Sequence, residues 1–348
     1  MSLSVDISPR IDAAAAREAA MARPRLGFLG VGWIGRQRLA AIADAGLAEV
    51  AAIADPDPGM REAAARSAPG AWLARSLDEL LAQPLDGIVI ATPSALHAGQ
   101  AEAALARGLA VFCQKPLART RAETRRVIDA ARAADRLLGV DLSYRETAGM
   151  RAIRELVASG QLGEVYAVDL VFHNAYGPDK PWFRDPRLAG GGCAIDLGTH
   201  LVDLALWTLD FPPVTAVTSR LHAAGRRLAL PTSQVEDHAT AQLDLADGGV
   251  VRLACSWNLP AGCDAVIEAS FHGTRGGACW RNVNGSFLDF VADRLDGTTR
   301  QRLADPPDDW GGRAAVRWAR QLARSPAFDP AIERLGAVAA VMDAIYGR

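Results

Sequence analysis

Short, almost wholly apolar runs alternate with amphipathic stretches between residues 24 and 144. The apolar runs predict strands that are buried on both faces, and the stretches between them predict helices. Strands that alternate with helices in this way are typical of a parallel sheet covered on both sides. The expected strands lie at 26–30, 49–54, 87–91, 110–113 and 137–142, and the expected helices at 34–45, 59–67, 97–107 and 121–134.

The pattern changes beyond residue 145. After a predicted helix at 149–159, apolar and polar residues alternate, as they do in strands with one buried face. Two such strands flank Asp247-Gly248-Gly249, which is typical of a hairpin turn. The expected strands lie at 240–245, 250–257, 265–272, 278–282 and 287–291, and helices are expected at 313–323 and 331–346.

These patterns predict an α/β plus α+β chain with two domains. Residues 23–145 are expected to form a doubly wound parallel sheet, and residues 146–348 an α+β domain with a mostly antiparallel open sheet. Residues 1–22 are an N-terminal extension with no predicted partner. The length of 348 residues agrees with two domains, because single cores rarely grow so large. We expect the C-terminal sheet to bind the substrate and to join a homodimer or homotetramer.

Composition narrows the classes of partner. The 38 lysines and arginines nearly balance the 40 aspartates and glutamates, so nothing favours nucleic acid or an anionic membrane as a partner. No apolar run is long enough to span a bilayer, and the first residues lack the pattern of a signal peptide. The five cysteines form no CxxC pair, which suits a reducing compartment. We therefore expect a cytoplasmic protein.

The segment after the first predicted strand reads GVGWIG, which is the GxGxxG pattern at the start of a helix. Gly30 permits a tight turn, Gly32 lets a pyrophosphate approach the backbone, and Gly35 lets the helix pack close to the sheet. Trp33 and Ile34 are expected beside the cofactor. The helix N-terminus would offer N–H groups to the phosphates.

Asp55 ends the next predicted strand, 20 residues after Gly35. A carboxylate there can accept hydrogen bonds from the ribose hydroxyls and would repel a 2′-phosphate. The cofactor predicted is therefore NAD, with NADP possible. The alternative is a glycine-rich turn that binds nothing, and the combination of strand, helix and acid argues against it.

Polar residues follow the next two predicted strands. Thr92 and Pro93 should border the cofactor, because ligands of such sheets lie beyond the carboxyl ends of the strands. His97 either contacts the cofactor or simply begins a helix. Gln114 and Lys115 end the following strand, where the lysine could bind a substrate oxygen or assist proton movement. The alternative for Lys115 is an ordinary solvated side chain.

The stretch IVIATPSALHAGQAEAALARGLAVFCQKPLA resembles a segment of the Gfo/Idh/MocA oxidoreductases, with its TP…H and Lys-Pro landmarks. The glycine loop, GQLGEV at 160–165 and GGGCAIDLGTH at 190–200 resemble other landmarks of that family. The resemblance implies a Rossmann domain followed by a substrate domain, and dehydrogenase chemistry with NAD or NADP. One departure is Gln114, where the family usually has a glutamate, and it leaves the role of Lys115 open.

Asp196 and His200 are four residues apart, so in a helix they would share one face. A histidine can take a proton from an alcohol while hydride leaves the same carbon, and a nearby carboxylate can orient it. The resemblance implies catalytic roles for Lys115, Asp196 and His200. Asp203 is either a supporting partner or a solvated carboxylate. The alternatives are a purely structural helix pair or a metal site, and the family's chemistry requires no metal.

Substrate contacts are harder to predict. The candidates follow strand ends or lie in a loop, and each could equally be a structural contact: Tyr144, Arg145, His173, Asn174 and Trp182. Of these, Arg145 could hold a carboxylate or phosphate. The function predicted is an NAD(P)-dependent dehydrogenase of a sugar, polyol or sugar derivative, with His200 as general acid/base. The alternatives are an NAD-responsive binding protein, or a glycosidase or epimerase that oxidises its substrate transiently.

Overall fold

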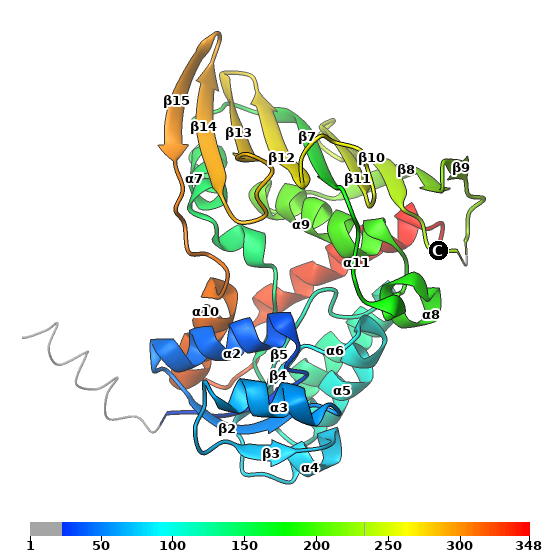
Figure 1. Ribbon diagram of the computed structural model, residues 1–348. Coiled ribbons are helices and arrows are strands. Elements are labelled where there is room, and N and C mark those ends of the chain that lie inside the picture. Colours follow the sequence, from blue (N-terminus) through cyan, green and yellow to red (C-terminus); the bar gives the residue numbers. More distant parts are fainter. Residues whose placement is uncertain (1–22, 233) are drawn as a thin grey trace, which may run out of the picture.

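The computed structural model describes residues 23–232 and 234–348, which form two packed units (Figure 1). The first is a parallel six-stranded sheet in the order β3-β2-β1-β4-β5-β6. This confirms the predicted doubly wound sheet. Its strands are β1 (Arg25–Leu29), β2 (Glu49–Ala54), β3 (Trp72–Ala74), β4 (Gly87–Ile90), β5 (Ala110–Cys113) and β6 (Leu138–Val140).

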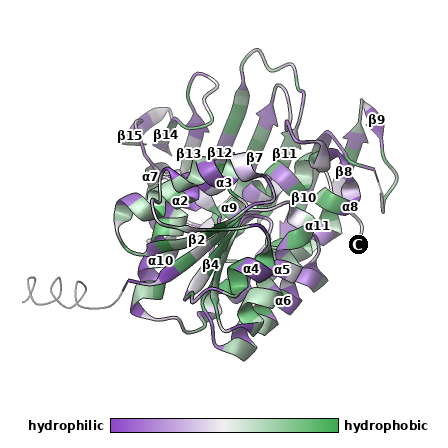
Figure 2. Cartoon of the chain, turned by 60° about the horizontal axis from the view of Figure 1, so that its bottom comes forward, coloured by the Kyte–Doolittle hydropathy of each residue, from purple (hydrophilic) through white to green (hydrophobic). Residues whose placement is uncertain are grey.

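Helices cover both faces of this sheet because its central strands are apolar on both sides; Figure 2 shows β4 coloured as hydrophobic between them. One face packs against α2 (Trp33–Ala45), α3 (Pro58–Ala65) and α10 (Arg313–Arg324). The other packs against α4 (Leu77–Leu81), α5 (Ser94–Ala106) and α6 (Arg121–Ala134). Helix α10 therefore completes the first unit although it follows the second in sequence.

The second unit is a nine-stranded sheet in the order β15-β14-β13-β12-β7-β11-β10-β8-β9, antiparallel except where β7 pairs with β11. This confirms the mostly antiparallel sheet. Its strands are β7 (Val165–Asn174), β8 (Val214–Ala223), β9 (Arg226–Arg227), β10 (His238–Leu245), β11 (Val250–Ser256), β12 (Ala265–Gly273), β13 (Gly276–Asn282), β14 (Phe290–Asp296) and β15 (Thr299–Ala304).

The helices of the second unit that the structure describes lie against one face of its sheet (Figure 1). They are α7 (Ala148–Ala158), α9 (Thr199–Thr208) and α11 (Leu335–Ile345), with the short α8 (Pro186–Ala189) beside the cleft. The predicted hairpin turn is present, since Leu245 N donates to Gly249 O at 2.8 Å. In the part of the chain that the structure describes, no helix is long and apolar enough to cross a membrane.

Candidate active site

A cleft of about 570 Å³ lies between the two units, beyond the carboxyl ends of β1, β4, β5 and β6. Both units line it, so each contributes part of any site formed there. The predicted residues that line it are Gly32, Trp33, Ile34, Thr92, Pro93, His97, Gln114, Lys115, Tyr144, Trp182, Asp196 and His200.

The glycine loop is shaped around an open space. A Cβ on Gly30 would lie 2.6 Å from Ala91 O, and one on Gly35 would lie 2.1 Å from Gly30 O. Gly30 also has a φ of +81°, which favours glycine. A Cβ on Gly32, in contrast, would meet no described atom within 4 Å and would only fill the cleft. The loop therefore fits a dinucleotide, whose phosphates could lie against Gly32 and the uncapped start of α2.

Asp55 lies next to this loop, at the end of β2. Its carboxylate accepts the N–H of Val31 at 2.9 Å and that of Asp57 at 3.0 Å. These bonds fix the acid beside the glycine loop, and a carboxylate has further acceptor sites for ribose hydroxyls. Asp55 does not itself line the cleft.

Lys115 and Asp196 meet across the boundary between the units. Lys115 Nζ donates to Asp196 Oδ1 at 2.7 Å and to the carbonyl of Asp196 at 2.6 Å. The other carboxylate oxygen accepts Trp257 Nε1–H at 3.2 Å. The peptide bond between Lys115 and Pro116 is cis. The lysine is thus an anchored cation in the cleft, which excludes the solvated alternative.

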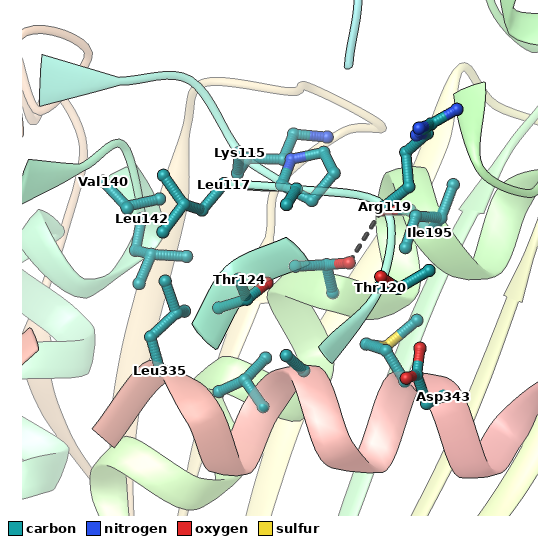
Figure 3. Close-up of a pocket in the computed structure, with 16 residues that line it drawn as sticks. Lys115, Leu117, Arg119, Thr120, Thr124, Val140, Leu142, Ile195, Leu335 and Asp343 are labelled. Atoms are coloured by element: carbon teal, nitrogen blue, oxygen red, sulfur yellow. Dashed lines mark hydrogen bonds between the residues drawn. The ribbon is translucent and has the colours of Figure 1, made fainter. Parts of the chain in front are cut away.

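The loop that carries Lys115 rests on α11. A cavity of about 30 Å³ lies between them, lined by Leu335, Val338 and Met342 of the helix (Figure 3). Just after the loop, Arg121 N donates to Asp343 Oδ2 at 3.0 Å. The C-terminal helix therefore supports the lysine from below.

His200 lies in the first turn of the α-helix that follows Asp196. Its side chain is buried, and its ring meets Tyr144 edge to face with centroids 4.8 Å apart. Burial, reinforced by the charges of Lys115 and Arg38, holds the pKa of the imidazole well below its usual range. No residue between 23 and 232 or 234 and 348 hydrogen-bonds the ring. A neutral imidazole with free nitrogens can accept a proton.

The segment that carries Asp196 differs from the expected α-helix. Residues Ala194–Gly198 form a π-helical turn, and the α-helix starts only at Thr199. Single π-helical turns are rare in proteins, and many of those that occur lie at functional sites. The turn contains Asp196, while His200 lies in the first turn of α9.

A buried carboxylate holds the start of this turn. Glu236 is fully buried and accepts N–H bonds from Gly192 at 3.0 Å and Ala194 at 2.8 Å, and the hydroxyl of Tyr346 at 2.7 Å. Burial raises the pKa of Glu236 although these donors oppose the shift. The Tyr346 oxygen in turn accepts Ile195 N–H at 3.1 Å.

Comparison with known proteins identifies the family. The family described as "Oxidoreductase family, NAD-binding Rossmann fold" matches residues 25–142 of this chain. The family described as "GFO/IDH/MocA C-terminal domain" matches residues 150–279. Inositol 2-dehydrogenase of Leifsonia xyli subsp. xyli is 39% identical over 252 residues, which are 71% of this chain and 70% of that protein. The chain belongs to the Gfo/Idh/MocA oxidoreductase family. The resemblance predicted from the motifs is therefore confirmed.

Other Gfo/Idh/MocA relatives match over different lengths. D-glucoside 3-dehydrogenase of Escherichia coli is 30% identical over 57% of this chain, and the match spans only 60% of that protein's length. Among solved structures, GenD2 from gentamicin A biosynthesis in complex with NAD is 25% identical and has a TM-score of 0.76, covering 93% of both chains. The first unit is thus an NAD-binding Rossmann domain of this family.

Gln114, the departure from the family's glutamate, has a partner of its own. Its amide donates to Asp141, whose same oxygen is paired with Arg38 Nε at 2.5 Å. Both ends of this ion pair are buried, and Arg38 also donates to the carbonyl of Gly311. A buried carboxylate therefore lies directly beside Gln114, at position 141. Sequence reasoning missed Arg38 and Asp141, as it missed Glu236 and Tyr346.

Four predicted residues turn out to be bonded to structural partners, and three of the four do not line the cleft. Arg145 makes a bidentate ion pair with buried Asp203, so it is not free to hold an anionic substrate, and Asp203 is not solvated. His173 does not line the cleft and bonds Ser256 Oγ at 2.8 Å. Asn174 also lies outside it and accepts Gly177 N–H at 2.7 Å.

The fourth is His97, which lines the cleft but is wholly buried. Its ring nitrogens lie 2.7 Å from the carbonyl oxygens of Thr92 and Pro116. This favours the structural alternative, because the ring joins the end of β4 to the loop after Lys115. Burial lowers the pKa of the imidazole.

Proposed function

We propose that this chain is a nicotinamide-dependent dehydrogenase of a CH–OH group in a sugar, polyol or sugar derivative, with His200 as general acid/base. The relatives named above support the substrate class, because they are dehydrogenases of inositol and of a glucoside. NAD bound at the glycine loop would supply the two-electron acceptor for the substrate carbon. Asp55 favours NAD over NADP, because a fixed carboxylate repels a 2′-phosphate.

The observation that supports this role best is the environment of His200. The imidazole is buried in the cleft, has no described hydrogen-bond partner, and has a lowered pKa. It is therefore neutral at pH 7 and can take the proton of a substrate hydroxyl. Lys115 can donate a hydrogen bond to the same oxygen and stabilise negative charge that develops there. Asp196 holds the ammonium in place.

Oxidation of a panel of sugars and polyols, followed by absorbance of reduced nicotinamide, tests the proposal. We expect His200→Ala to lower kcat by about 10²–10⁴-fold, the usual contribution of general acid–base catalysis. NAD affinity, measured by calorimetry, should stay within about twofold. His272→Ala is the matched control, since this histidine is paired with Asp169 and does not line the cleft.

The pH profile gives a second readout on the same proteins. Oxidation requires neutral His200, which predominates above its pKa, and that pKa lies below the ordinary 6.5. In the wild type kcat/KM for oxidation should therefore stay level as the pH falls through 6.5 and decline only below it. Unchanged turnover in His200→Ala would exclude the assigned role. Product release without net reduced nicotinamide would instead favour transient oxidation.

A further inference from the structure

The second unit lines the cleft in part with aromatic rings. Its contributions include Phe172, Trp182, Phe183, Phe287 and Trp310. Tyr144, just before α7, adds a sixth ring and is buried. Phe172 and Trp310 are also buried, at 3% and 7% exposed, so the partly exposed rings of the cleft are Trp182, Phe183 and Phe287.

Charged groups on this side are few and mostly engaged. Asp179 and Lys180 pair with each other at 3.1 Å and are 81% and 63% exposed, so they lie at the mouth. Asp196 and His200 belong to the proposed reaction site. A polyol with a hydroxyl on every carbon would exchange water for aromatic carbon at several positions. Each hydroxyl enclosed without a partner opposes binding.

One edge of the cleft is a fixed apolar lip, Phe287-Leu288, in the connection between β13 and β14. Leu288 is 59% exposed, yet its backbone is held, because its carbonyl accepts Trp310 Nε1–H at 2.9 Å and its N–H donates to Ser286 Oγ at 3.1 Å. The ring of Phe287 packs 6.5 Å from that of Phe172. Exposed apolar side chains held rigidly at a cleft are typical of ligand sites.

We propose that the natural substrate carries an apolar, ring-sized substituent, as an aryl glycoside or a similar sugar derivative does. Its sugar ring reacts at Lys115 and His200, and its substituent packs against Trp182 and the Phe287-Leu288 lip. This inference rests on the proposed function for the identity of the reacting site. One partly exposed ring suffices to stack on the apolar face of a sugar, so the other two partly exposed rings are left for the substituent.

The test compares free, methyl and phenyl forms of glucose, galactose and mannose, with myo-inositol, as substrates of the full chain with NAD. We expect kcat/KM for the best phenyl glycoside to exceed that of its methyl counterpart at least about tenfold. Leu288→Ser should lower this ratio about fivefold, because the substituent loses an apolar contact. Leu73→Ser is the matched control: Leu73 is 39% exposed on edge strand β3, outside the cleft, and the ratio should not change.

Calorimetric titration with the phenyl and methyl glycosides, with NAD present, needs no turnover and separates the two proposals. Equal or better oxidation of the methyl or free sugars overturns the inference and leaves the proposed function standing. A phenyl-to-methyl ratio of kcat/KM that is unchanged in Leu288→Ser also overturns the inference and leaves the proposed function standing. Tighter binding of the phenyl glycoside, weakened by Leu288→Ser and accompanied by no oxidation of any sugar, supports the inference and contradicts the proposed function. If no compound is bound and none is oxidised, both the inference and the proposed function are overturned.

Discussion

At the scale of single residues, one feature of the site is the position of a buried carboxylate near Lys115. The family's motif has a glutamate before Lys115, and this chain has Gln114 with Asp141 next to it. The Gln114 amide donates to Asp141, which pairs with Arg38. A buried carboxylate needs such partners, because desolvation opposes its charged form. Gln114 is thus the residue that fits beside Asp141, and the two must be considered together.

We therefore expect Gln114→Glu to destabilise the protein, although it restores the family's residue. Two buried carboxylates would then compete for Arg38, and the free energy of unfolding should fall by about 1–3 kcal/mol at neutral pH. Repulsion raises the pKa of one carboxyl, so the deficit should shrink as the pH falls and that group is protonated. Urea unfolding at several pH values measures both effects.

The double variant Gln114→Glu/Asp141→Asn is the control, since it exchanges the two charges and should recover most of the lost stability. Asp141→Asn alone leaves Arg38 buried without its carboxylate and should cost about 3–5 kcal/mol. If the two substitutions changed the free energy of unfolding additively, that result would contradict an energetic coupling between Gln114 and Asp141.

Some of these residues could be predicted from sequence and others could not. The glycine loop, Lys115, Asp196 and His200 lie in contiguous motifs, so a local pattern finds them. Glu236 contacts Gly192 from 44 positions away and Tyr346 from 110. Contacts over such separations depend on the whole topology, and no local pattern marks the acid that makes them.

At the scale of elements, the π-helical turn Ala194–Gly198 is the feature that places Asp196. Its backbone N–H groups are held from outside: by Glu236 at Ala194 and by Tyr346 at Ile195. The hydroxyl of Tyr346 also donates to Glu236 at 2.7 Å, so the end of α11 fixes both the acid and the turn.

Tyr346→Phe should consequently loosen this turn. It removes a donor from buried Glu236 and an acceptor from Ile195 N–H, and we expect a loss of about 1–3 kcal/mol in the free energy of unfolding. Sugar oxidation should fall about tenfold in kcat, because Asp196 and Lys115 are less well positioned. Tyr166→Phe, at a 57% exposed tyrosine, is the control and should change neither quantity. If Tyr346→Phe had the stability and turnover of the wild type, the π-helical turn would not depend on the hydroxyl of Tyr346.

Element prediction was more successful in the first unit than in the second. Buried parallel strands are apolar on both faces, so they stand out in the sequence. Strands β8 (VTAVTSRLHA) and β15 (TRQRLA) were missed, because β8 is exposed on much of its length and β15 has no apolar alternation. Both are defined by the strands with which they pair. Tertiary pairing of this kind overrides local propensity.

At the scale of the whole molecule, the two units are interleaved in sequence. Helix α10 comes after the second sheet and returns to cover a face of the first, a contact that the predicted division at residue 145 does not include. Trp318 of this helix is 3% exposed, with its ring 5.6 Å from that of Phe112. Gly139 makes room for it, since a Cβ there would lie 2.7 Å from the indole. The homodimer or homotetramer through the C-terminal sheet stays a prediction.

Helix α10 closes the core of the Rossmann sheet, so Trp318→Ala should lower the free energy of unfolding of the cofactor domain. Trp318 lies outside the predicted boundary of that domain, at residue 145. Removing a buried indole costs about 3–5 kcal/mol, so urea should unfold the variant at a clearly lower concentration. Trp72→Ala is the matched control, because Trp72 is 42% exposed on edge strand β3 and its loss should cost under about 1 kcal/mol. NAD affinity of the folded variant should stay close to wild type, since Trp318 does not line the cleft. If Trp318→Ala were no more harmful than Trp72→Ala, the first unit would be stable without α10, and the division at residue 145 would describe it adequately.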